Sequence, residues 1–275
     1  MIQAGLLLGG SASQASTLWA NRPPAASNAG AIFWCSDVVQ GGCLLRSDGV
    51  NWLPLGGVAK LAQSATPCIL LSNGSSNATG QITSTALPYT PSGVCNVYLP
   101  AGVVTAGSAG TGAGLYPAIF SSSGICQIQG TGIVTANTSF TQTTSQVALC
   151  APIAIPAGFL GANGALQISA LFEANNSANS KTPTASIGAT MVWGAAALTT
   201  APTIDSIKTI RNRGALNVQS VHPSFIAGAA SGTNTVQTSI DFSVAQSLVF
   251  NGQLAVPASD YLIFDGYTIV AYPQT

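Results

Sequence analysis

No long stretch of this chain carries apolar residues at the 3.6-residue spacing of an amphipathic helix. Thirty glycines and fifteen prolines are spread over its 275 residues, and both residue types end helices and mark turns. Between these turns, short runs of β-branched and aromatic residues recur, which is typical of an all-β sandwich or barrel. The clearest predicted strands are 68–71, 96–99, 115–120, 125–128, 146–151, 165–173, 185–192, 204–213, 234–242, 247–254 and 261–271.

Two of these segments carry clear patterns. In 165–173, ALQISALFE, apolar residues alternate with a mixed set, as a half-buried strand requires. In 260–272, DYLIFDGYTIVAY, apolar residues follow one another almost without a break. That pattern predicts a strand covered on both faces, or one inside a subunit interface.

The composition changes near residue 60 and predicts three parts. Residues 1–19 are rich in glycine and serine, carry no basic residue that would favour a secretory signal, and read as an extended arm. Residues 20–58 form a small module with a predicted hairpin, LLRSDGVNWLPL, that turns at Asp48 and Gly49. Residues 62–275 are expected to form one larger β-sandwich domain.

Charge is scarce along the whole chain. Charged residues make up 5% of it and the net charge is zero, whereas roughly 25% of an average soluble domain is charged. Because charge keeps protein molecules apart, the composition favours a subunit that assembles with copies of itself or with other proteins over a solitary protein. The sequence has no extended basic region and no apolar run of membrane-spanning length, so we expect neither nucleic-acid binding nor membrane insertion.

The residues for a catalytic site are sparse. The chain has one histidine, His222, and one glutamate, Glu173. A serine-type triad would need His222, which precedes a proline in an expected loop, and glycoside hydrolysis would need two carboxylates about one bond. The aspartates of the second half are scattered singly: Asp205, Asp241, Asp260 and Asp265. We therefore predict no enzymatic activity, no cofactor and no bound metal, with polysaccharide cleavage as a weaker alternative.

Aromatic side chains offer a possible carbohydrate-binding surface. Trp193, Tyr116 and Tyr89 are the candidates. Burial in the core is the favoured interpretation of all three, because aromatic residues supply much of the buried area of β-sandwiches.

The six cysteines form no C-x-x-C pair, which argues against a zinc ribbon or a thioredoxin-type site. We expect free, buried thiols, with one candidate disulfide. Cys35 and Cys43 flank a predicted hairpin loop, SDVVQGG, and would face each other across two strands. In a reducing cytosol that bond would form late or not at all.

The segment 207–214, IKTIRNRG, holds three of the seven basic residues of the chain. On a strand, Arg211 and Arg213 lie on one face, about 7 Å apart, and Lys208 lies on the other. The expected carboxylate partners are Glu173 and Asp241, at the ends of neighbouring predicted strands. We predict that this cluster fixes strand register and subunit docking. A solvated edge strand, where charge blocks unwanted pairing, is an equal alternative.

The segment RPPAASNAGAIFWCSD, followed by LLRSDGVNWLPLG, resembles a short module of bacteriophage tail and fibre proteins. The residues that match that module are Arg22, Pro23, Gly30, Phe33, Asp37, Ser47, Asp48, Gly49 and Trp52. The larger domain is similar to a β-sandwich of phage virion structural proteins in the pieces VYLPAGVVTAGSAGTGAGLYPAIFSS, IPAGFLGANGALQISALFEANNSANSKT, IRNRG and FNGQLAVPASDYLIFDGYTIV. The order of these pieces is more specific than any one of them. The cysteines depart from the family pattern.

The resemblance implies a virion component with jelly-roll-like subunits, a homotrimer attached to the particle by its N-terminal arm. It supplies no catalytic residue. The first expected function is a fibre or spike, assembled in the host cytoplasm, that binds other virion proteins of the tail, neck or capsid and contacts a host surface glycan. The second is a capsid decoration or cement protein. The third, weaker one is a polysaccharide-degrading tailspike.

Overall fold

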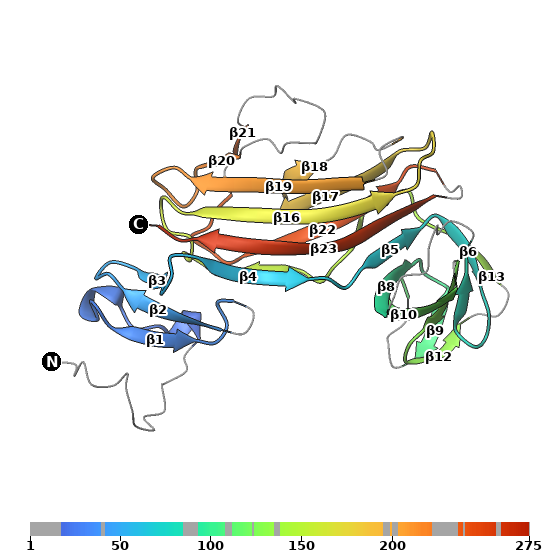
Figure 1. Ribbon diagram of the computed structural model, residues 1–275, viewed down its shortest axis with the longest axis horizontal. Helices are drawn as coiled ribbons and strands as arrows, with labels where there is room; N and C mark the ends of the chain where they lie inside the picture. Colours follow the sequence, from blue (N-terminus) through green and yellow to red (C-terminus); the bar gives the residue numbers. More distant parts are fainter. Residues whose placement is uncertain are drawn as a thin grey trace.

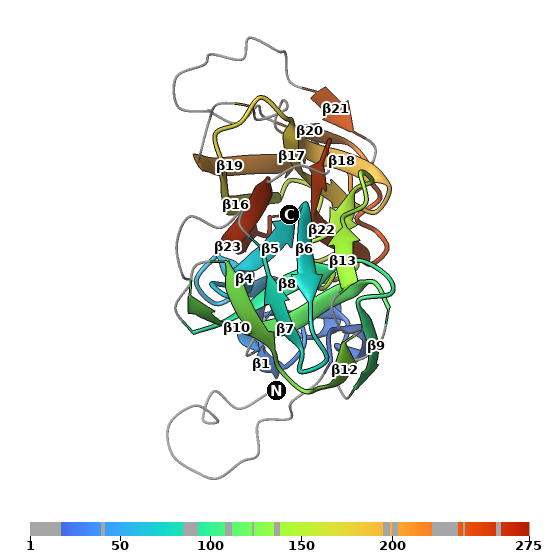
Figure 2. The same ribbon diagram turned by 90° about the vertical axis from the view of Figure 1, so that its right-hand side faces the viewer.

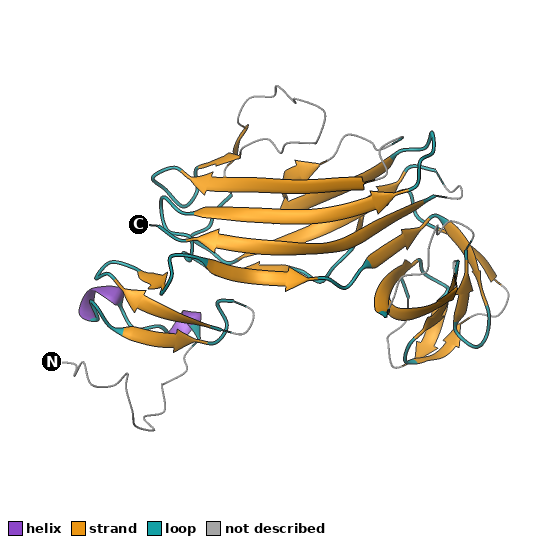
Figure 3. Cartoon of the chain, viewed as in Figure 1, coloured by secondary structure: helices purple, strands orange, loops and turns teal. Residues whose placement is uncertain are grey.

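The computed structural model describes residues 18–39, 42–84, 93–107, 112–122, 124–134, 138–194, 199, 203–221, 236–238, 240–256 and 260–274. Over these ranges the protein is built from β-strands, with two short 3-10 helices, Trp19–Asn21 and Ala25–Ser27 (Figure 3). The prediction of an all-β protein is thereby confirmed. No helix among these residues is long and apolar enough to cross a membrane.

Two sheets stack to form the larger body, called the sandwich below (Figure 1). One sheet contains β4 (Ala59–Ser64), β23 (Tyr261–Tyr272), β16 (Ala165–Ala174), β19 (Thr203–Asn212), β20 (Gln219–Val221) and β21 (Val236–Thr238). The other contains β14 (Val147–Ala148), β15 (Ile153–Ile155), β22 (Gln246–Leu254), β17 (Lys181–Ile187) and β18 (Thr190–Gly194). All pairings within the two sheets are antiparallel, as in a β-sandwich.

Aromatic rings fill the space between the two sheets. Phe264 on β23 lies 4.7 Å from the ring centres of both Phe172 and Phe250. Trp193 stacks on Phe172 at 5.4 Å, and Tyr267 stacks on Phe250 at 5.3 Å. Such ring pairs add to the free energy of area burial, so this cluster is the centre of the sandwich core.

The first sheet continues beyond β23 into a second body, which we call the distal unit (Figure 2). β5 (Cys68–Leu71) pairs with β23 and, in parallel, with β8 (Val94–Leu99). The remaining strands are β6 (Asn73–Ser76), β7 (Gln81–Thr83), β9 (Val104–Gly107), β10 (Gly114–Ser122), β11 (Ile125–Ile128), β12 (Thr131–Val134) and β13 (Thr138–Thr141). Their buried side chains form a second hydrophobic cluster. The segment 62–275 therefore holds two cores.

β5 and the start of β23 lie between these two cores. Leu70 and Phe264 pack in the sandwich cluster, whereas Ile69 and Ile263 pack in the distal cluster. Successive side chains of a strand point to opposite faces. The two runs CILL and YLIF are therefore apolar throughout because each is covered on both sides, one of the two environments that the sequence predicted for the second run.

The N-terminal module is a three-stranded sheet of β1 (Ile32–Cys35), β2 (Cys43–Ser47) and β3 (Trp52–Pro54). The predicted hairpin is confirmed, since Ser47 pairs with Trp52 around a turn in which Gly49 has φ +94°. A residue with a side chain rarely adopts that conformation. Residues 1–17 of the predicted arm lie outside the described residues. Trp19, which the predicted boundary placed at the end of the arm, is buried with the module and connects it to the sandwich, because its Nε1 donates to the carbonyl oxygen of Ala157 at 2.8 Å.

Several strand predictions need correction. The predicted strand 185–192 is instead the pair β17 and β18 around a turn at Gly188, where φ is +56°. Only Val147–Ala148 of the predicted strand 146–151 pairs with a neighbour. The predicted strand 234–242 lies partly outside the described residues, within which it contains Val236–Thr238. The short strands β4, β6, β7, β9, β12, β13 and β15 carry too few residues for a readable period.

Candidate functional site

One face of the long sheet points away from the sandwich core. The second sheet lies behind it in Figure 1. We define this outer sheet face by the outward residues of β16, β19 and β23, which are Gln167, Ser169, Leu171, Glu173, Asp205, Ile207, Thr209, Arg211, Thr268, Val270 and Tyr272. Two of its large apolar side chains are exposed, Ile207 to 53% and Leu171 to 37%. Its middle is uncharged, whereas Glu173 and Asp205 lie toward one end and Arg211 toward the other.

Arg211 and Lys208 lie on opposite faces of β19 as predicted, whereas Arg213, predicted to lie beside Arg211 on the strand, follows its end. Arg211 lies on the outer sheet face, and its neighbours Ile210 and Asn212 are buried on the opposite face. Lys208 is on that inner side and half-buried, and desolvation lowers the pKa of its ammonium group. Arg213 follows the end of β19, and its Nε donates to Ser220 Oγ at 2.9 Å.

Within one chain, the expected acidic partners are not brought to these arginines. Glu173 faces Thr203, while Arg211 faces Ala165, eight residues away along β16. That separation is about 26 Å at the usual rise of a strand. Asp241 is exposed and accepts hydrogen bonds from the backbone N–H and hydroxyl of Ser243, which lower the pKa of its carboxyl. The expected intrachain partnership is wrong, and a role of the cluster in subunit docking stays a prediction.

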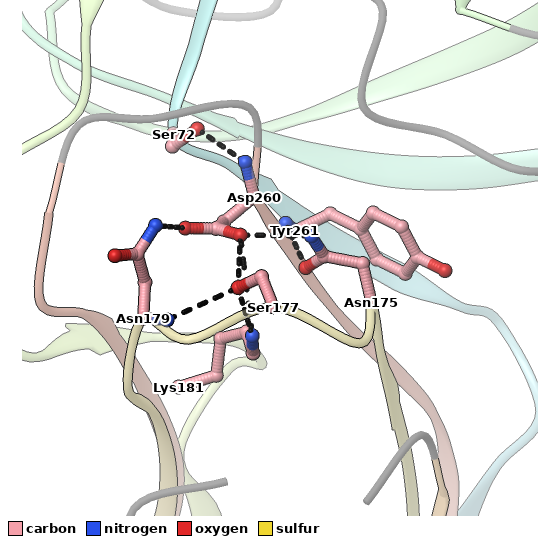
Figure 4. Close-up of polar contacts among 7 residues, drawn as sticks. All are labelled: Ser72, Asn175, Ser177, Asn179, Lys181, Asp260 and Tyr261. Carbon is pink, nitrogen blue, oxygen red and sulfur yellow. Dashed lines mark hydrogen bonds and ion pairs between the residues drawn. The ribbon is translucent and has the colours of Figure 1, made fainter. Parts of the chain in front are cut away.

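A buried carboxylate, Asp260, organises a separate polar network at the junction of the sandwich and the distal unit (Figure 4). Its Oδ1 accepts hydrogen bonds from Asn175 Nδ2 and Ser177 Oγ, both at 2.7 Å, and its Oδ2 accepts one from Asn179 Nδ2 at 2.7 Å. Lys181 Nζ lies 3.9 Å from Oδ1 and donates to Ser177 Oγ at 2.7 Å. Both carboxylate oxygens are therefore satisfied by this turn between β16 and β17.

The electrostatics of this network favour the ionised carboxylate. Burial alone would raise the pKa of Asp260, but the hydrogen bonds from Ser177, Asn175 and Asn179 and the charge of Lys181 together lower it. For Lys181, the loss of hydration outweighs the attraction of Asp260, so its pKa is lowered. Removing either partner would leave the other charge buried without its counterion.

The same network also connects the sandwich to the distal unit by hydrogen bonds. The backbone N–H of Asp260 donates to Ser72 Oγ at 2.9 Å, and Ser72 N–H donates back to the carbonyl oxygen of Asp260 at 3.0 Å. The backbone N–H of Tyr261 donates to Asn175 Oδ1 at 3.1 Å. Three segments that are far apart in the sequence thus meet at one carboxylate, so we assign the network a structural role. The sequence analysis did not predict this network, although the polar run NNSANSK, residues 175–181, could have indicated it.

Asp265 is the extra residue of a β-bulge in β23. Leu171 pairs with Gly266 and Phe172 pairs with Phe264, which leaves Asp265 without an opposite residue. Its buried Oδ2 has no hydrogen-bond partner among the described residues. Burial, with a smaller contribution from the charge of Glu173, raises the pKa of Asp265 to about 6. Together with Asp205 it lines a pocket of about 220 Å³ at the edge of the outer sheet face.

The cysteines are all free, as expected. Cys35 and Cys43 are direct cross-strand partners, as the predicted hairpin required, but no disulfide joins them. Cys35 Sγ instead donates to Asp37 Oδ1 at 3.3 Å. Burial, with the neighbouring Cys35, raises the pKa of Cys43 to about 11, so its thiol is protonated near neutral pH.

Two of the three aromatic candidates for a carbohydrate surface belong to the cores. Trp193 is buried in the sandwich and Tyr116 in the distal unit, where its hydroxyl donates to the carbonyl oxygen of Gly112 at 2.7 Å. Tyr89 and His222 lie outside the described residues. Among the described residues, no group of three or more His, Cys, Asp or Glu side chains is placed to hold a metal ion.

A pocket that the sequence did not predict lies between the N-terminal module and the sandwich. It measures about 350 Å³, and its lining includes Trp19, Arg22 and Trp52 from the module and Phe159 from the sandwich. Arg22 and Trp52 belong to the residues that carry the resemblance to the phage module, but their convergence with Phe159 depends on the fold.

Comparison with known proteins identifies no relative of this chain. No protein-family model and no curated protein matches it.

Proposed function

We propose that the protein is a bacteriophage virion structural protein. In this proposal it is a homotrimeric fibre or spike subunit that is attached to the particle by its N-terminal segment and contacts the host surface. It has no enzymatic activity, and its subunits are jelly-roll-like. Two features support the proposal: the outer sheet face, which is the observation that carries it, and the internal bonding of the residues that resemble the phage module.

The outer sheet face has the properties of a surface covered in an assembly. The outward residues span 167–173 on β16, 205–211 on β19 and 268–272 on β23, so the three strands present a surface of about 300 Å². Its uncharged middle contains the exposed Ile207, and the exposed Leu171 lies beside it, opposite Asp205. A solitary protein usually carries lysine and glutamate on such a face to prevent association. A stable interface buries roughly 800 Å² per partner, so this face would supply about a third of that area.

The residues that resemble the phage module hold one another in place. Asp48 Oδ1 accepts the backbone N–H groups of Val50 and Asn51 at 2.7 and 2.6 Å, which closes the hairpin turn. Trp52 Nε1 donates to the carbonyl oxygen of Pro23 at 2.7 Å, and Ser47 Oγ donates to that of Ala25 at 2.8 Å. The motif therefore describes one bonded unit, which supports the resemblance as more than a chance match of loose positions.

The test is the mass of the purified protein, measured by light scattering during size-exclusion chromatography. We expect three times the chain mass of 27.5 kDa. Ile207→Glu places a charge in the middle of the outer sheet face and should shift the population to monomer. Met191→Glu is the matched control, because Met191 is 61% exposed but belongs to β18 in the other sheet.

A wild-type protein that stays monomeric at high concentration would contradict the proposal. A stable dimer would contradict the trimer. If Ile207→Glu and Met191→Glu both leave the oligomer intact, the outer sheet face is not the contact surface.

A further inference from the structure

The pocket beside the N-terminal module has a defined lining. Its lining comes from three stretches, 19–25, 50–53 and 158–161. The volume of about 350 Å³ is within the range of small-molecule sites. Val50 at this site is 76% exposed, so the pocket is reached from solvent beside an apolar side chain.

Its aromatic walls are fixed by hydrogen bonds and ring contacts. The ring of Trp19 meets Phe159 edge-on at 5.1 Å, and its Nε1 is bonded to Ala157. The ring of Trp52 meets Phe33 edge-on at 4.4 Å, and its Nε1 is bonded to Pro23. Walls that are held in this way need little reordering when a ligand binds, which favours affinity.

Arg22 supplies the charge of the pocket. Its guanidinium carbon lies 4.0 Å from the centre of the Trp19 ring, and Nη1 donates to the carbonyl oxygen of Trp19 at 2.8 Å. Desolvation lowers the pKa of the guanidinium, which nevertheless stays charged. Within the described part of the chain, the only ion pair joins Lys181 and Asp260, so no carboxylate neutralises Arg22. A guanidinium has five N–H donors, and most of those of Arg22 remain for a ligand.

We propose that this pocket binds an anionic saccharide, a sugar ring that carries a carboxylate or a phosphate. A guanidinium binds either group with two parallel hydrogen bonds, which selects for an anion. Pro23, Val50 and Leu53 offer apolar contacts for the C–H face of a sugar ring, and Asn51 brings an amide to the same lining for hydroxyl groups. The pocket directly follows the segment that is proposed to attach to the particle. The inference therefore does not make this pocket the surface that faces the host, and it rests on the proposed function only in choosing a saccharide over other ring-sized anions.

The test is titration of the full-length protein with glucuronic acid, glucose 6-phosphate and glucose, followed by calorimetry and by ligand-observed NMR. Acetate and inorganic phosphate are the charge-only controls. We expect at least one of the two anionic sugars to bind at least tenfold more tightly than glucose and than its matching small anion, because a charge-assisted hydrogen bond is worth roughly one to two powers of ten in affinity. Comparison of the two sugars identifies whether the carboxylate or the phosphate is preferred.

Variants then locate the binding. Arg22→Gln should weaken the anionic sugar at least tenfold. Arg46→Gln removes the same charge from an exposed position of β2 outside the pocket lining, so it should leave affinity within about twofold. Val50→Glu keeps the contact between Arg22 and Trp19 and adds a repelling charge at the exposed position, so it should weaken binding without disturbing the fold.

Equal binding of glucose and the anionic sugars would overturn the inference, as would acetate or phosphate binding as tightly as the sugars. An unchanged affinity in both Arg22→Gln and Val50→Glu would also overturn it. Chromatography of the same samples separates the two proposals. A trimer that binds no sugar contradicts only the ligand, and a monomer that binds the sugar contradicts only the assembly.

Discussion

The sandwich and the distal unit share two strands but arrange the aromatic rings of their cores differently. In the sandwich core, Phe172, Trp193, Phe250 and Phe264 form a cluster in which the centres of contacting rings lie 4.7 to 6.4 Å apart. The distal core also contains four aromatic residues, Tyr116, Phe120, Phe140 and Tyr261, which lie among aliphatic side chains and the thiols of Cys95 and Cys126. In the described part of the chain, no two of these four rings pair with each other.

A glycine shows how close the packing of the distal unit is. A Cβ atom at Gly74 would lie 2.6 Å from the ring of Phe140 and 2.8 Å from the carbonyl oxygen of Thr83. The approach of β6 to β13 therefore depends on the absence of a side chain. The comparison teaches that rings packed on one another stabilise the sandwich, whereas in the distal unit the ring of Phe140 packs closely on backbone that carries no side chain. The following predictions test that distinction.

The largest effect is expected from Phe264→Ala. Phe264 is buried and in contact with two other rings, so its truncation should lower the free energy of unfolding by about 3–5 kcal/mol. Urea unfolding followed by tryptophan fluorescence measures this loss. Val94→Ala, at an exposed position of β8, is the control and should change the value by less than about 0.5 kcal/mol. A loss below about 1 kcal/mol for Phe264→Ala would show that the rings are not central to stability.

The next effect addresses the joint between the two units. Asp260→Ala leaves Lys181 buried without its counterion and should cost about 3 kcal/mol. Hydrogen exchange should become faster in β5 and in the β16–β17 turn. In the double variant with Lys181→Met, part of this loss should be recovered, since no lone charge remains. Strictly additive losses would mean that the two residues are not coupled.

The same carboxylate predicts a dependence on pH. The pKa of Asp260 is lower in the folded protein than its usual value of about 3.9. Its contribution to stability is therefore fully present above that pH, and it is lost as the pH falls through the lowered folded pKa. Wild type should become less stable below about pH 4, and Asp260→Ala should show a smaller decline.

A third, smaller loss of stability should be confined to the distal unit. Cys95 is fully buried in the distal unit, with its Sγ 3.6 Å from the carbonyl oxygen of Ala118. Cys95→Ser places a hydroxyl in this apolar site and should cost about 1–3 kcal/mol. Hydrogen exchange measured by mass spectrometry should become faster in β8, β10 and β11 and stay unchanged in β16 and β22. Cys43→Ser, at a partly exposed position, is the control. Equal acceleration in both units would show that they open together.

The smallest effect has the opposite sign. The pKa of Asp265 is raised to about 6, so the folded state holds its proton more tightly than the unfolded state. Ionisation therefore costs stability above about pH 6, and this cost disappears below the usual pKa of about 4. Asp265→Asn should raise the free energy of unfolding by about 1 kcal/mol at pH 8, a value discounted for partial exposure, and by nothing near pH 4. A variant less stable than wild type at pH 8 would contradict this.

The fold could be predicted from the sequence where burial alternates along a strand. The segments 165–173 and 247–254 correspond closely to β16 and β22 because each has one buried face. The turn between β17 and β18 was missed because apolar residues continue through Gly188 and conceal it. The short strands of the distal unit were not predicted, because three or four residues are too few to show an alternation of apolar and polar side chains.

The candidate sites depend on contacts that the sequence does not record. Asp260 bonds to Asn175, which is 85 residues away, and Trp19 meets Phe159 only after the module docks. The separation of Glu173 from Arg211 follows from the register of β16 against β19. The two-residue period of a strand gives the face on which a side chain lies but not the register between strands, so the faces of Lys208 and Arg211 were predicted correctly and the carboxylate partners were not.

The strands β5 and β23, which run between the two cores, determine how the molecule responds to force. A hinge needs loop residues that can change their backbone angles, but here the passage from one body to the other consists of hydrogen-bonded strand. The distal unit is therefore joined to the sandwich by continuous sheet rather than by a flexible linker. A force applied to the distal unit is transmitted to the sandwich through the hydrogen bonds of β23, so the two bodies move together as one rigid subunit.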